Sequence, residues 1–282
     1  MDFGYVGWPE AIAKTHVSET MVQALGHETE SEEYTLPAIV QGLETGDLDL
    51  FVEAWIPSMQ SMLDEADEEQ IESLAVNLPE TTYSLAVNKE AYEAGVVSHA
   101  DLDEFSGEFD GEIYGIEPGN DGNEIILTMI EDDTYGLGDW ELVESSTSGM
   151  LGEVGRRTSD GEWVVFAGWE PHWMNQEYDM EFLEDPEAAW GEQSHVETLA
   201  NQQFAEENPE LRQLFSQMKL NKDVQATWIN EIDNTDKDPE EIALEWLSEN
   251  PEMTQEWLDG VEATDGTDGF EALQSYLEEQ RA

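Results

Sequence analysis

Three tryptophans stand where a strand is expected to end, and each is followed by a proline within two residues. They are Trp8, Trp55 and Trp169, and each comes after a short apolar run. Apolar runs of this length with β-branched residues are typical of buried strands. Ligands bind at strand ends in open α/β sheets. Indoles in these positions therefore predict the wall of a binding site.

Residues 164–174 show the pattern most fully and also carry the main alternative. The stretch begins as a continuous apolar run, breaks at Gly168 and ends with Trp169, His172 and Trp173. Aromatic side chains are most often packing residues, so this stretch alone favours a role in the core. Three strand ends of the same kind are harder to explain as three unrelated core residues. We therefore favour a ligand role for Trp169 and a packing role for Trp173.

The charge of the chain excludes several classes of partner. The 282 residues include 68 Asp and Glu but only 9 Lys and Arg, a net charge of -59. Such a surface repels nucleic acid phosphates and anionic lipids. The 10 Trp, 9 Phe and 8 Tyr argue against disorder, because disordered chains are poor in aromatic residues. A folded protein with a carboxylate-rich surface fits a high-salt setting, where self-repulsion is screened.

Other features narrow the chemistry. The chain has no cysteine, so disulfides and thiol chemistry are excluded. No stretch approaches the roughly 20 apolar residues of a membrane span, and none near Met1 is a signal segment, so we expect a trimmed mature chain. Phosphate-binding loops, paired-histidine metal motifs and nucleophile elbows are missing. His16 and His172 alone are a weak zinc pair. We expect no metal, no cofactor and no catalytic residues.

The predicted elements alternate between strand and helix as far as about residue 175. Strands are expected at residues 3–7, 34–36, 48–52, 82–87, 113–116, 140–143 and from 164. Helices are expected at residues 9–25, 37–43, 60–75, parts of 88–110, from the loop at 117–123 through 130, 148–157, 222–232, 238–248, 252–260 and 270–280, and residues 186–215 also carry helical signals. This alternation indicates α/β architecture with mostly parallel sheets. The helical tail has no predicted strand and must pack onto an earlier lobe.

A turn-rich loop at residues 117–123 precedes one predicted helix. It contains Asn120, Asp121 and Gly122. Backbone N–H groups at a helix N-terminus form a ready site for an anion. A plain turn is the simpler interpretation of this loop by itself.

Several short motifs together resemble a known family. They are Gly7-Trp8-x-Glu10, Gly46-Asp47-Leu48-Asp49 leading to Ala54-Trp55-Ile56-Pro57, Gly115-Ile116-Glu117-Pro118-Gly119, Ser145-Ser146-Thr147, Gly168-Trp169-x-Pro171-His172-Trp173-Met174, Tyr178-Asp179 and Phe182-Leu183-Glu184-Asp185-Pro186. The chain resembles, to about residue 260, the extracytoplasmic substrate-binding proteins of ABC importers for glycine betaine, choline and related compatible solutes.

The resemblance implies a fold and a domain organisation. The fold would be the α/β, two-lobed periplasmic-binding-protein fold, of type II-like topology, with a hinge between the lobes and the ligand in the cleft. Lobe one would hold residues 1–84 together with the returning helical tail at 191–282. Lobe two would hold residues 85–190.

The resemblance also implies an aromatic box. Trp8 and Trp55 would face Trp169 across the cleft and surround a quaternary ammonium group, and Tyr83 matches a box tyrosine of the choline-binding branch. A trimethylammonium group has no N–H to donate but is attracted to indole faces. Each cation–π contact contributes about 0.5–2 kcal/mol, and three rings with methyl burial give about micromolar affinity.

The opposite end of the ligand is less constrained by the resemblance. Glu10 and Asn120 match positions that meet the choline hydroxyl in one branch. Gln60 stands where the betaine-binding branch has a histidine that helps to hold the carboxylate. The amides of residues 120–123, those of Asp121 and Gly122 included, are an alternative carboxylate contact. We interpret His172 as supporting the site by hydrogen bonding.

The expected function is capture of a quaternary-ammonium solute and its delivery to the membrane permease of an ABC importer, by an extracytoplasmic monomer. Glycine betaine is the first ligand expected. Choline is the alternative, and trimethylamine N-oxide and carnitine-like compounds follow. Two other classes stay open: an acidic hydrolase whose tryptophans stack on sugars, and a partner-binding surface protein whose tryptophans are core residues.

Overall fold

The chain forms two compact units. The computed structural model describes residues 1–67, 69–191 and 193–281. Unit 1 contains Met1–Ile56, Gln60–Pro79 and His195–Ala282, and unit 2 contains Pro57–Met59 and Glu80–Ser194. Residues 68, 192 and 282 fall within the predicted acidic helix and the predicted tail, and they lie outside the described residues.

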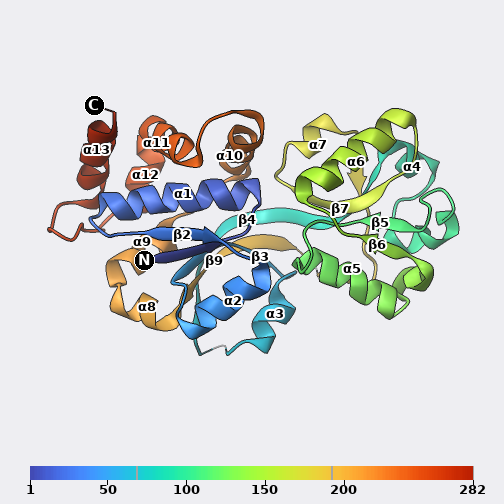
Figure 1. Cartoon of the computed structure of the whole chain (residues 1–282), viewed down its shortest axis with the longest axis horizontal. Coiled ribbons are helices and arrows are strands. Elements are labelled where there is room, and N and C mark those ends of the chain that lie inside the picture. Colours follow the sequence, from blue (N-terminus) through green and yellow to red (C-terminus); the bar gives the residue numbers. More distant parts are fainter. Residues whose placement is uncertain (68, 192, 282) are drawn as a thin grey trace. The chain divides into compact units, whose positions relative to one another are not determined.

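Unit 1 is a mixed sheet with helices on both faces (Figure 1). Its strands run in the order β2 (Glu30–Glu33), β1 (Asp2–Tyr5), β3 (Leu50–Ile56), β9 (Ser194–Asn201) and the first part of β4 (Ile71–Asn88). One face carries α1 (Pro9–Ala24), α10 (Lys222–Asn234), α11 (Pro239–Glu249), α12 (Pro251–Trp257) and α13 (Gly269–Gln280). The other helices are α2 (Leu36–Thr45), α3 (Gln60–Glu65), α8 (Gln202–Glu207) and α9 (Pro209–Gln217).

Unit 2 repeats the layered plan on a smaller scale. The second part of β4 pairs with β7 (Val165–Glu170) and β8 (Met180–Phe182), and β7 continues to β5 (Glu112–Tyr114) and β6 (Glu141–Val143). In Figure 1, α6 (Thr147–Asp160) and α7 (Met174–Glu177) lie on the opposite side of this sheet from α5 (Asp121–Glu131). The remaining helices are α4 (Lys89–Ala94) and the short 3-10 turns η1 (His99–Asp101), η2 (Asp103–Phe105) and η3 (Thr134–Asp139).

Helix α1 is buried on more than one side. It contacts β3 of the sheet and also α10, α11 and α13. Its start is set by Pro9 in the first turn, where the missing N–H has no helical partner to lose. Because neighbours surround it, α1 buries polar side chains as well as apolar ones, among them Glu10, Lys14 and Ser18.

The helices that follow β9 have a tryptophan core of their own. The rings of Trp228 and Trp246 meet edge to face at 4.9 Å, and Trp246 stacks on Trp257 at 5.6 Å. All three side chains are buried. Some tryptophans of this chain are therefore packing residues, as one of the alternative interpretations of the sequence requires.

The predicted helix at residues 60–75 is largely wrong. Helix α3 ends at Glu65, and the long strand β4 begins at Ile71. The missed signal is a period of two, because Leu74, Val76 and Leu78 alternate with small or polar residues. The many acidic residues before them lack the apolar spacing of a helix.

The prediction of a tail without a strand and of mostly parallel sheets is also corrected. Strand β9 lies in the tail and pairs antiparallel with β3, and β4 pairs antiparallel with β7 and β8. The polar residues Ser194 and Thr198 occupy buried positions of β9. The sequence therefore lacks the alternation of apolar and polar residues that would predict a strand. The strand expected at 34–36 is instead β2, an acidic strand at the sheet edge with no apolar signal.

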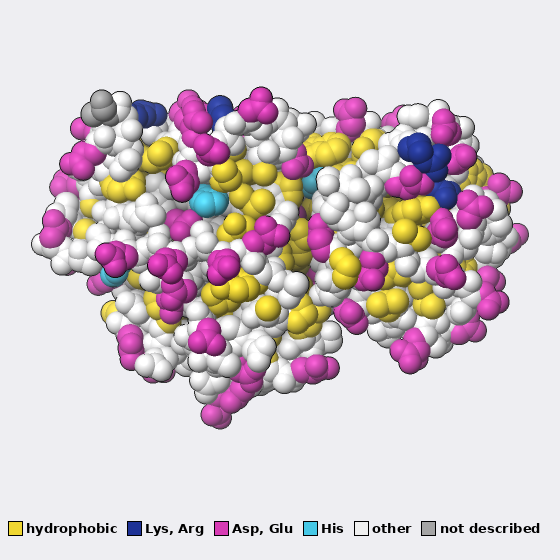
Figure 2. Space-filling view, in the orientation of Figure 1, with side chains coloured by type: hydrophobic (Ala, Val, Ile, Leu, Met, Phe, Trp, Pro, Cys, Tyr) yellow, Lys and Arg dark blue, Asp and Glu magenta, His cyan; other side chains and the backbone are white. Residues whose placement is uncertain are grey.

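Acidic side chains are spread over the whole face shown in Figure 2, where Lys and Arg occur in a few small groups. Two of the basic side chains are inside: Lys14 is 0% exposed and Arg157 is 7% exposed. No helix in the described part of the chain is long and apolar enough to cross a membrane.

Candidate functional site

In unit 1, two of the predicted ligand-binding tryptophans lie at the ends of elements. Trp8 is the N-cap of α1, and its side chain makes no capping hydrogen bond. Trp55 is the last but one residue of β3, where it pairs with Val196 of β9. Both side chains are buried. The sequence thus positions each indole by a rigid element rather than by a flexible loop.

A buried ionic cluster adjoins these tryptophans in the chain. Glu10 and Lys14 are four residues apart on one face of α1. Lys14 forms an ion pair with Glu53 of β3, and its ammonium also donates to Asn77 Oδ1 at 3.0 Å. Gln225 of α10 donates to Glu53 Oε1 at 3.2 Å. Each of these five side chains is at most 2% exposed.

The ionisation of this cluster is strongly perturbed. Burial and the nearby Glu53 carboxylate raise the pKa of Glu10 to about 8. Burial lowers the pKa of Lys14 and raises the pKa of Glu53, and each partner opposes the shift of the other. Glu10 Oε2 is buried and has no hydrogen-bond partner among the described residues.

In unit 2, three aromatic side chains form a corner. Tyr83 of β4 lies directly opposite Trp169 of β7 in the antiparallel pairing, so both side chains stand on the same face of the sheet. Their rings meet edge to face at 6.2 Å. Trp190 packs against Tyr83 at 4.8 Å. The indole N–H groups of Trp169 and Trp190 are buried without a partner among the described residues.

The N-terminus of α5 contacts this corner. The side chain of Asn120 caps the helix by accepting from Gly122 N at 2.8 Å, and it also accepts from the Tyr83 hydroxyl at 2.9 Å. A Cβ atom on Gly122 would lie 2.1 Å from the Tyr83 oxygen, so glycine is required for this approach. Burial raises the pKa of Asp121 to about 6, although the Ser58 side chain and the Gly122 amide act to lower it.

His172 lies in the loop after β7 as a buried neutral side chain. Burial lowers its pKa to about 3. Its Nδ1 accepts from Met174 N at 3.1 Å, which leaves the proton on Nε2, and its ring meets Trp169 at 5.0 Å. Asn175 donates to the backbone oxygens of Trp169 and His172. These contacts hold the loop against the end of β7.

A set of polar side chains fixes the segment that carries Trp190. Asp185 accepts from Trp190 N at 2.8 Å and from the Tyr135 hydroxyl at 2.5 Å. His99 lies 3.3 Å from Ser84 Oγ and 3.4 Å from Asp185. Burial acts to raise the pKa of Asp185, but contacts with His99, the Trp190 amide and Tyr135 lower it overall.

The contacts from Ser84 to His99 and from His99 to Asp185 resemble the arrangement of hydroxyl, imidazole and carboxylate in a hydrolytic triad. The distance from His99 to Asp185 is longer than a normal hydrogen bond. Asp185 is already engaged by Tyr135 and by the Trp190 backbone. We therefore interpret these groups as support for Trp190 rather than as catalytic residues.

Gln60 is placed differently from the other predicted residues. It is the first residue of α3, is exposed, and donates to Asp64 Oδ1 at 2.7 Å on its own helix. Its expected contact with a ligand carboxylate stays a prediction, as do the ligand contacts of the other predicted site residues. No group of three potential metal-ligating side chains occurs within the described ranges.

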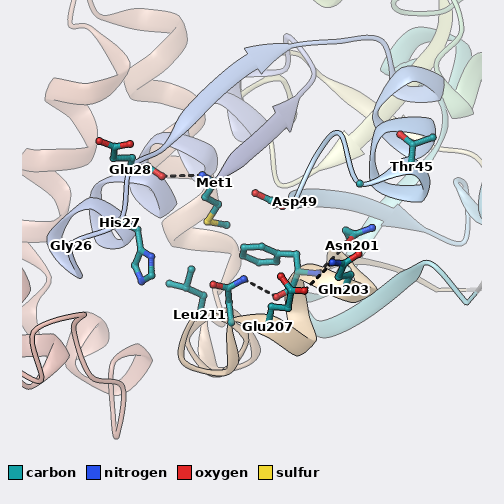
Figure 3. Close-up of a pocket in the computed structure, with 13 residues that line it drawn as sticks. Met1, Gly26, His27, Glu28, Thr45, Asp49, Asn201, Gln203, Glu207 and Leu211 are labelled. Atoms are coloured by element: carbon teal, nitrogen blue, oxygen red, sulfur yellow. Dashed lines mark hydrogen bonds between the residues drawn. The ribbon is translucent and has the colours of Figure 1, made fainter.

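A separate cavity of unit 1 contains none of the predicted site residues. It has a volume of about 630 Å³ and is lined by residues that include His27, Glu28, Asp49 and Glu207 (Figure 3). None of its described lining residues is a tryptophan or a tyrosine, the side chains that the proposed aromatic box requires.

Sequence reasoning missed Lys14, Glu53 and Trp190. Two signals were present: Glu53 stands two residues before Trp55, and Lys14 is one of only 9 basic residues and follows Glu10 by four residues on the predicted helix. Trp190 had no local signal, because it lies in an irregular segment after β8.

Comparison with known proteins supports one family. Residues 2–249 match the model of the substrate binding domain of ABC-type glycine betaine transport systems. An ABC-transporter choline binding protein in complex with choline is 34% identical, with a TM-score of 0.94 over 98% of this chain and 97% of that chain. Lactococcal OpuAC, closed on glycine betaine, is 25% identical, with a TM-score of 0.82 over 91% of this chain and 98% of that chain.

A third relative is known from its sequence. The glycine betaine/carnitine transport binding protein GbuC of Listeria monocytogenes is 32% identical over 127 residues, which are 45% of this chain and 42% of GbuC. The family match covers most of the chain, and the solved structures share its mixed α/β periplasmic-binding-protein fold. This chain belongs to the family of substrate-binding domains of ABC-type glycine betaine transport systems.

Proposed function

We propose that this protein binds a quaternary-ammonium solute with Trp8, Trp55, Trp169 and Tyr83 and delivers it to the permease of an ABC importer. The observation that carries the proposal is the aromatic corner of unit 2, where Tyr83 and Trp169 stand opposite each other on paired strands. Trp8 and Trp55, at the ends of rigid elements of unit 1, support it.

The aromatic corner of unit 2 suits a quaternary ammonium group, which has no N–H to donate. Tyr83 and Trp169 contact Trp190, the Asn120 amide and a neutral His172. None of these is a cation that would repel the ligand. A trimethylammonium group gains cation–π attraction from the ring faces and buries its methyl groups against them.

Choline is the first ligand to test, and glycine betaine is the second, which reverses the order expected from sequence. The choline-binding relative is more similar to this chain than OpuAC is, at 34% against 25% identity. Glu10, a buried acid two residues from Trp8, can supply a negative charge to a cation by losing its proton, whereas glycine betaine brings a carboxylate of its own. The Tyr83 to Asn120 hydrogen bond offers a polar partner for a hydroxyl.

The two units would act as the two lobes of a binding protein, joined by a hinge and closing on the ligand. Substrate-binding proteins of ABC importers are extracytoplasmic, and the family serves transport rather than catalysis. We propose further that the protein is monomeric and has no hydrolytic activity. A panel of glycosides and esters that gave no turnover would support the last point.

Calorimetry with single tryptophan variants tests the function. We expect wild-type protein to bind choline or glycine betaine with about micromolar affinity. Trp8→Ala, Trp55→Ala and Trp169→Ala should each weaken binding at least tenfold, because each removes one ring from the ammonium. The same panel should include carnitine, proline betaine and trimethylamine N-oxide.

Trp163→Ala is the matched control, because Trp163 packs on Phe105 and Phe109 elsewhere in unit 2. It should lower stability without changing the affinity of the folded protein. Unchanged affinity in all three site variants, or no binding of any compound in the panel, would overturn the proposed function.

A further inference from the structure

The buried cluster of unit 1 contains more acidic groups than basic groups. It contains the carboxyl groups of Glu10 and Glu53 but a single ammonium, that of Lys14. Lys14 is committed to Glu53 by the ion pair and to Asn77 by a hydrogen bond. Whether the Lys14 and Glu53 pair is ionic or neutral, its total charge is zero. The net charge of the cluster therefore depends on Glu10.

Of the charged groups that face Glu10, Lys14 favours its ionised form, whereas Glu53 and Asp233 oppose it. On its own helix it faces Lys14, which is held by Glu53, and Glu53 itself on β3 repels a second negative charge. Asp233 on α10 adds repulsion from the third packed element. Glu10 Oε2 is buried without a partner among the described residues. Burial and repulsion by Glu53 outweigh the attraction of Lys14 and a backbone hydrogen bond to Glu10, so the neutral acid is favoured.

We propose that Glu10 selects the charge class of the ligand, by holding a proton in the ligand-free protein and releasing it to solvent when a cationic ammonium binds. The proposal rests on the proposed function, in which Trp8, two residues before Glu10, contacts the ligand. It agrees with the raised pKa of Glu10, about 8, which burial and Glu53 produce.

The proposal separates choline from glycine betaine by proton balance. Choline brings a net charge of one, so an ionised Glu10 becomes favourable and its proton leaves. Glycine betaine is neutral overall, and its carboxylate gains a hydrogen bond from a protonated Glu10. Choline binding should therefore strengthen as the pH rises toward 8, by up to about tenfold per pH unit. Glycine betaine binding should stay level or weaken over the same range.

Calorimetry in two buffers measures the released proton directly. Wild-type protein is titrated with choline at pH 7.0 in phosphate and in imidazole, whose ionisation enthalpies differ. The difference in apparent enthalpy gives the number of protons exchanged. We expect release of close to one proton per choline and much less per glycine betaine.

Two variants assign the proton to its group. Glu10→Gln should still bind, with choline affinity independent of pH and with no proton release. Asp49→Asn is the matched control, because burial also raises the pKa of Asp49 in the same unit. It precedes β3, six residues from Trp55, and lines the cavity of Figure 3. This variant should release the same proton as wild type.

Each outcome decides between the two ideas. Choline binding without proton exchange in wild type, or proton release that persists in Glu10→Gln, would overturn the role of Glu10 and leave the proposed function standing. Failure of wild type to bind any quaternary ammonium would overturn the proposed function instead. The measurement of proton exchange on choline binding uses wild-type protein alone, so it remains decisive even if a variant folds poorly.

Discussion

The two units bring opposite kinds of chemistry to the proposed site. In unit 1, Trp8 and Trp55 are accompanied by buried ionisable groups, above all Glu10 and the Lys14 and Glu53 pair. In unit 2, Tyr83 and the other aromatic rings are accompanied by an amide cap and a histidine that burial keeps neutral.

From this difference we infer that aromatic and ionisable groups serve separate roles in ligand recognition. Aromatic rings on both units would recognise the methylated ammonium, which every ligand of the class shares. Ionisable groups concentrated in one unit can respond to what differs among ligands, namely their net charge. Asp121, whose pKa is about 6, is the exception in unit 2, but it is mostly ionised at neutral pH. Substitutions that change the charge in one unit at a time test this difference between the units.

The largest effect should come from removing the ammonium of the buried cluster. Lys14→Met leaves Glu53 without its partner in a fully buried position. Breaking one side of a buried ion pair typically costs about 3–5 kcal/mol of stability. We expect a clearly lower urea midpoint, followed by the fluorescence of the tryptophans.

Arg156→Met in unit 2 is the corresponding control. Arg156 is about half exposed and pairs with Glu153, Asp160 and Glu162 at the surface. Exposed pairs contribute little to stability. A midpoint as low as that of Lys14→Met would mean that unit 1 does not depend on buried charge more than unit 2 does.

A second effect concerns the pH dependence of stability without ligand. The folded pKa of Glu10 lies above its ordinary value, so its contribution to stability is greatest at low pH and is lost as the pH rises toward 8. Between pH 5.5 and 7.5 wild type should lose about 1.4 kcal/mol per pH unit relative to Glu10→Gln. Urea unfolding of both proteins at several pH values measures this difference. Parallel curves would show that Glu10 ionises normally in the folded protein.

The sequence carries a clearer signal for the aromatic residues of the proposed site than for the charged ones. Trp8, Trp55 and Trp169 follow apolar runs and precede prolines, a pattern that is visible without any tertiary information. Among 68 acidic residues, Glu10 and Glu53 stand out by their places beside Trp8 and Trp55, but nothing in the sequence shows that they are buried. Their burial depends on the packing of α1 against the sheet and against α10, α11 and α13, which lie near the other end of the chain.

The same reasoning explains which elements were predicted. Helices α1, α5 and α6 have clear starts and apolar spacing, and the sequence placed them within a few residues. Strands β2 and β9 were missed because their stability comes from neighbours rather than from an apolar pattern. Glu30–Glu33 pairs with β1 through its backbone, and β9 buries Thr198 and Asn201, which have hydrogen-bond partners inside the unit.

The smallest effect should come from Trp190, which would act on the ligand only through Tyr83. Its ring meets Tyr83 edge to face, and Asp185 holds its backbone, so it fixes the direction of the Tyr83 ring. Trp190→Phe keeps an aromatic side chain but loses part of this contact, which is worth about 0.5–1.5 kcal/mol for such pairs. We expect choline affinity to fall about threefold to tenfold with proton release unchanged, because Glu10 lies in the other unit. An altered proton count would show that the two chemistries are coupled, and the division between the units would then be wrong. Tyr83→Phe is the variant with which Trp190→Phe is compared, because it keeps the aromatic ring at residue 83 and loses the hydrogen bond to Asn120.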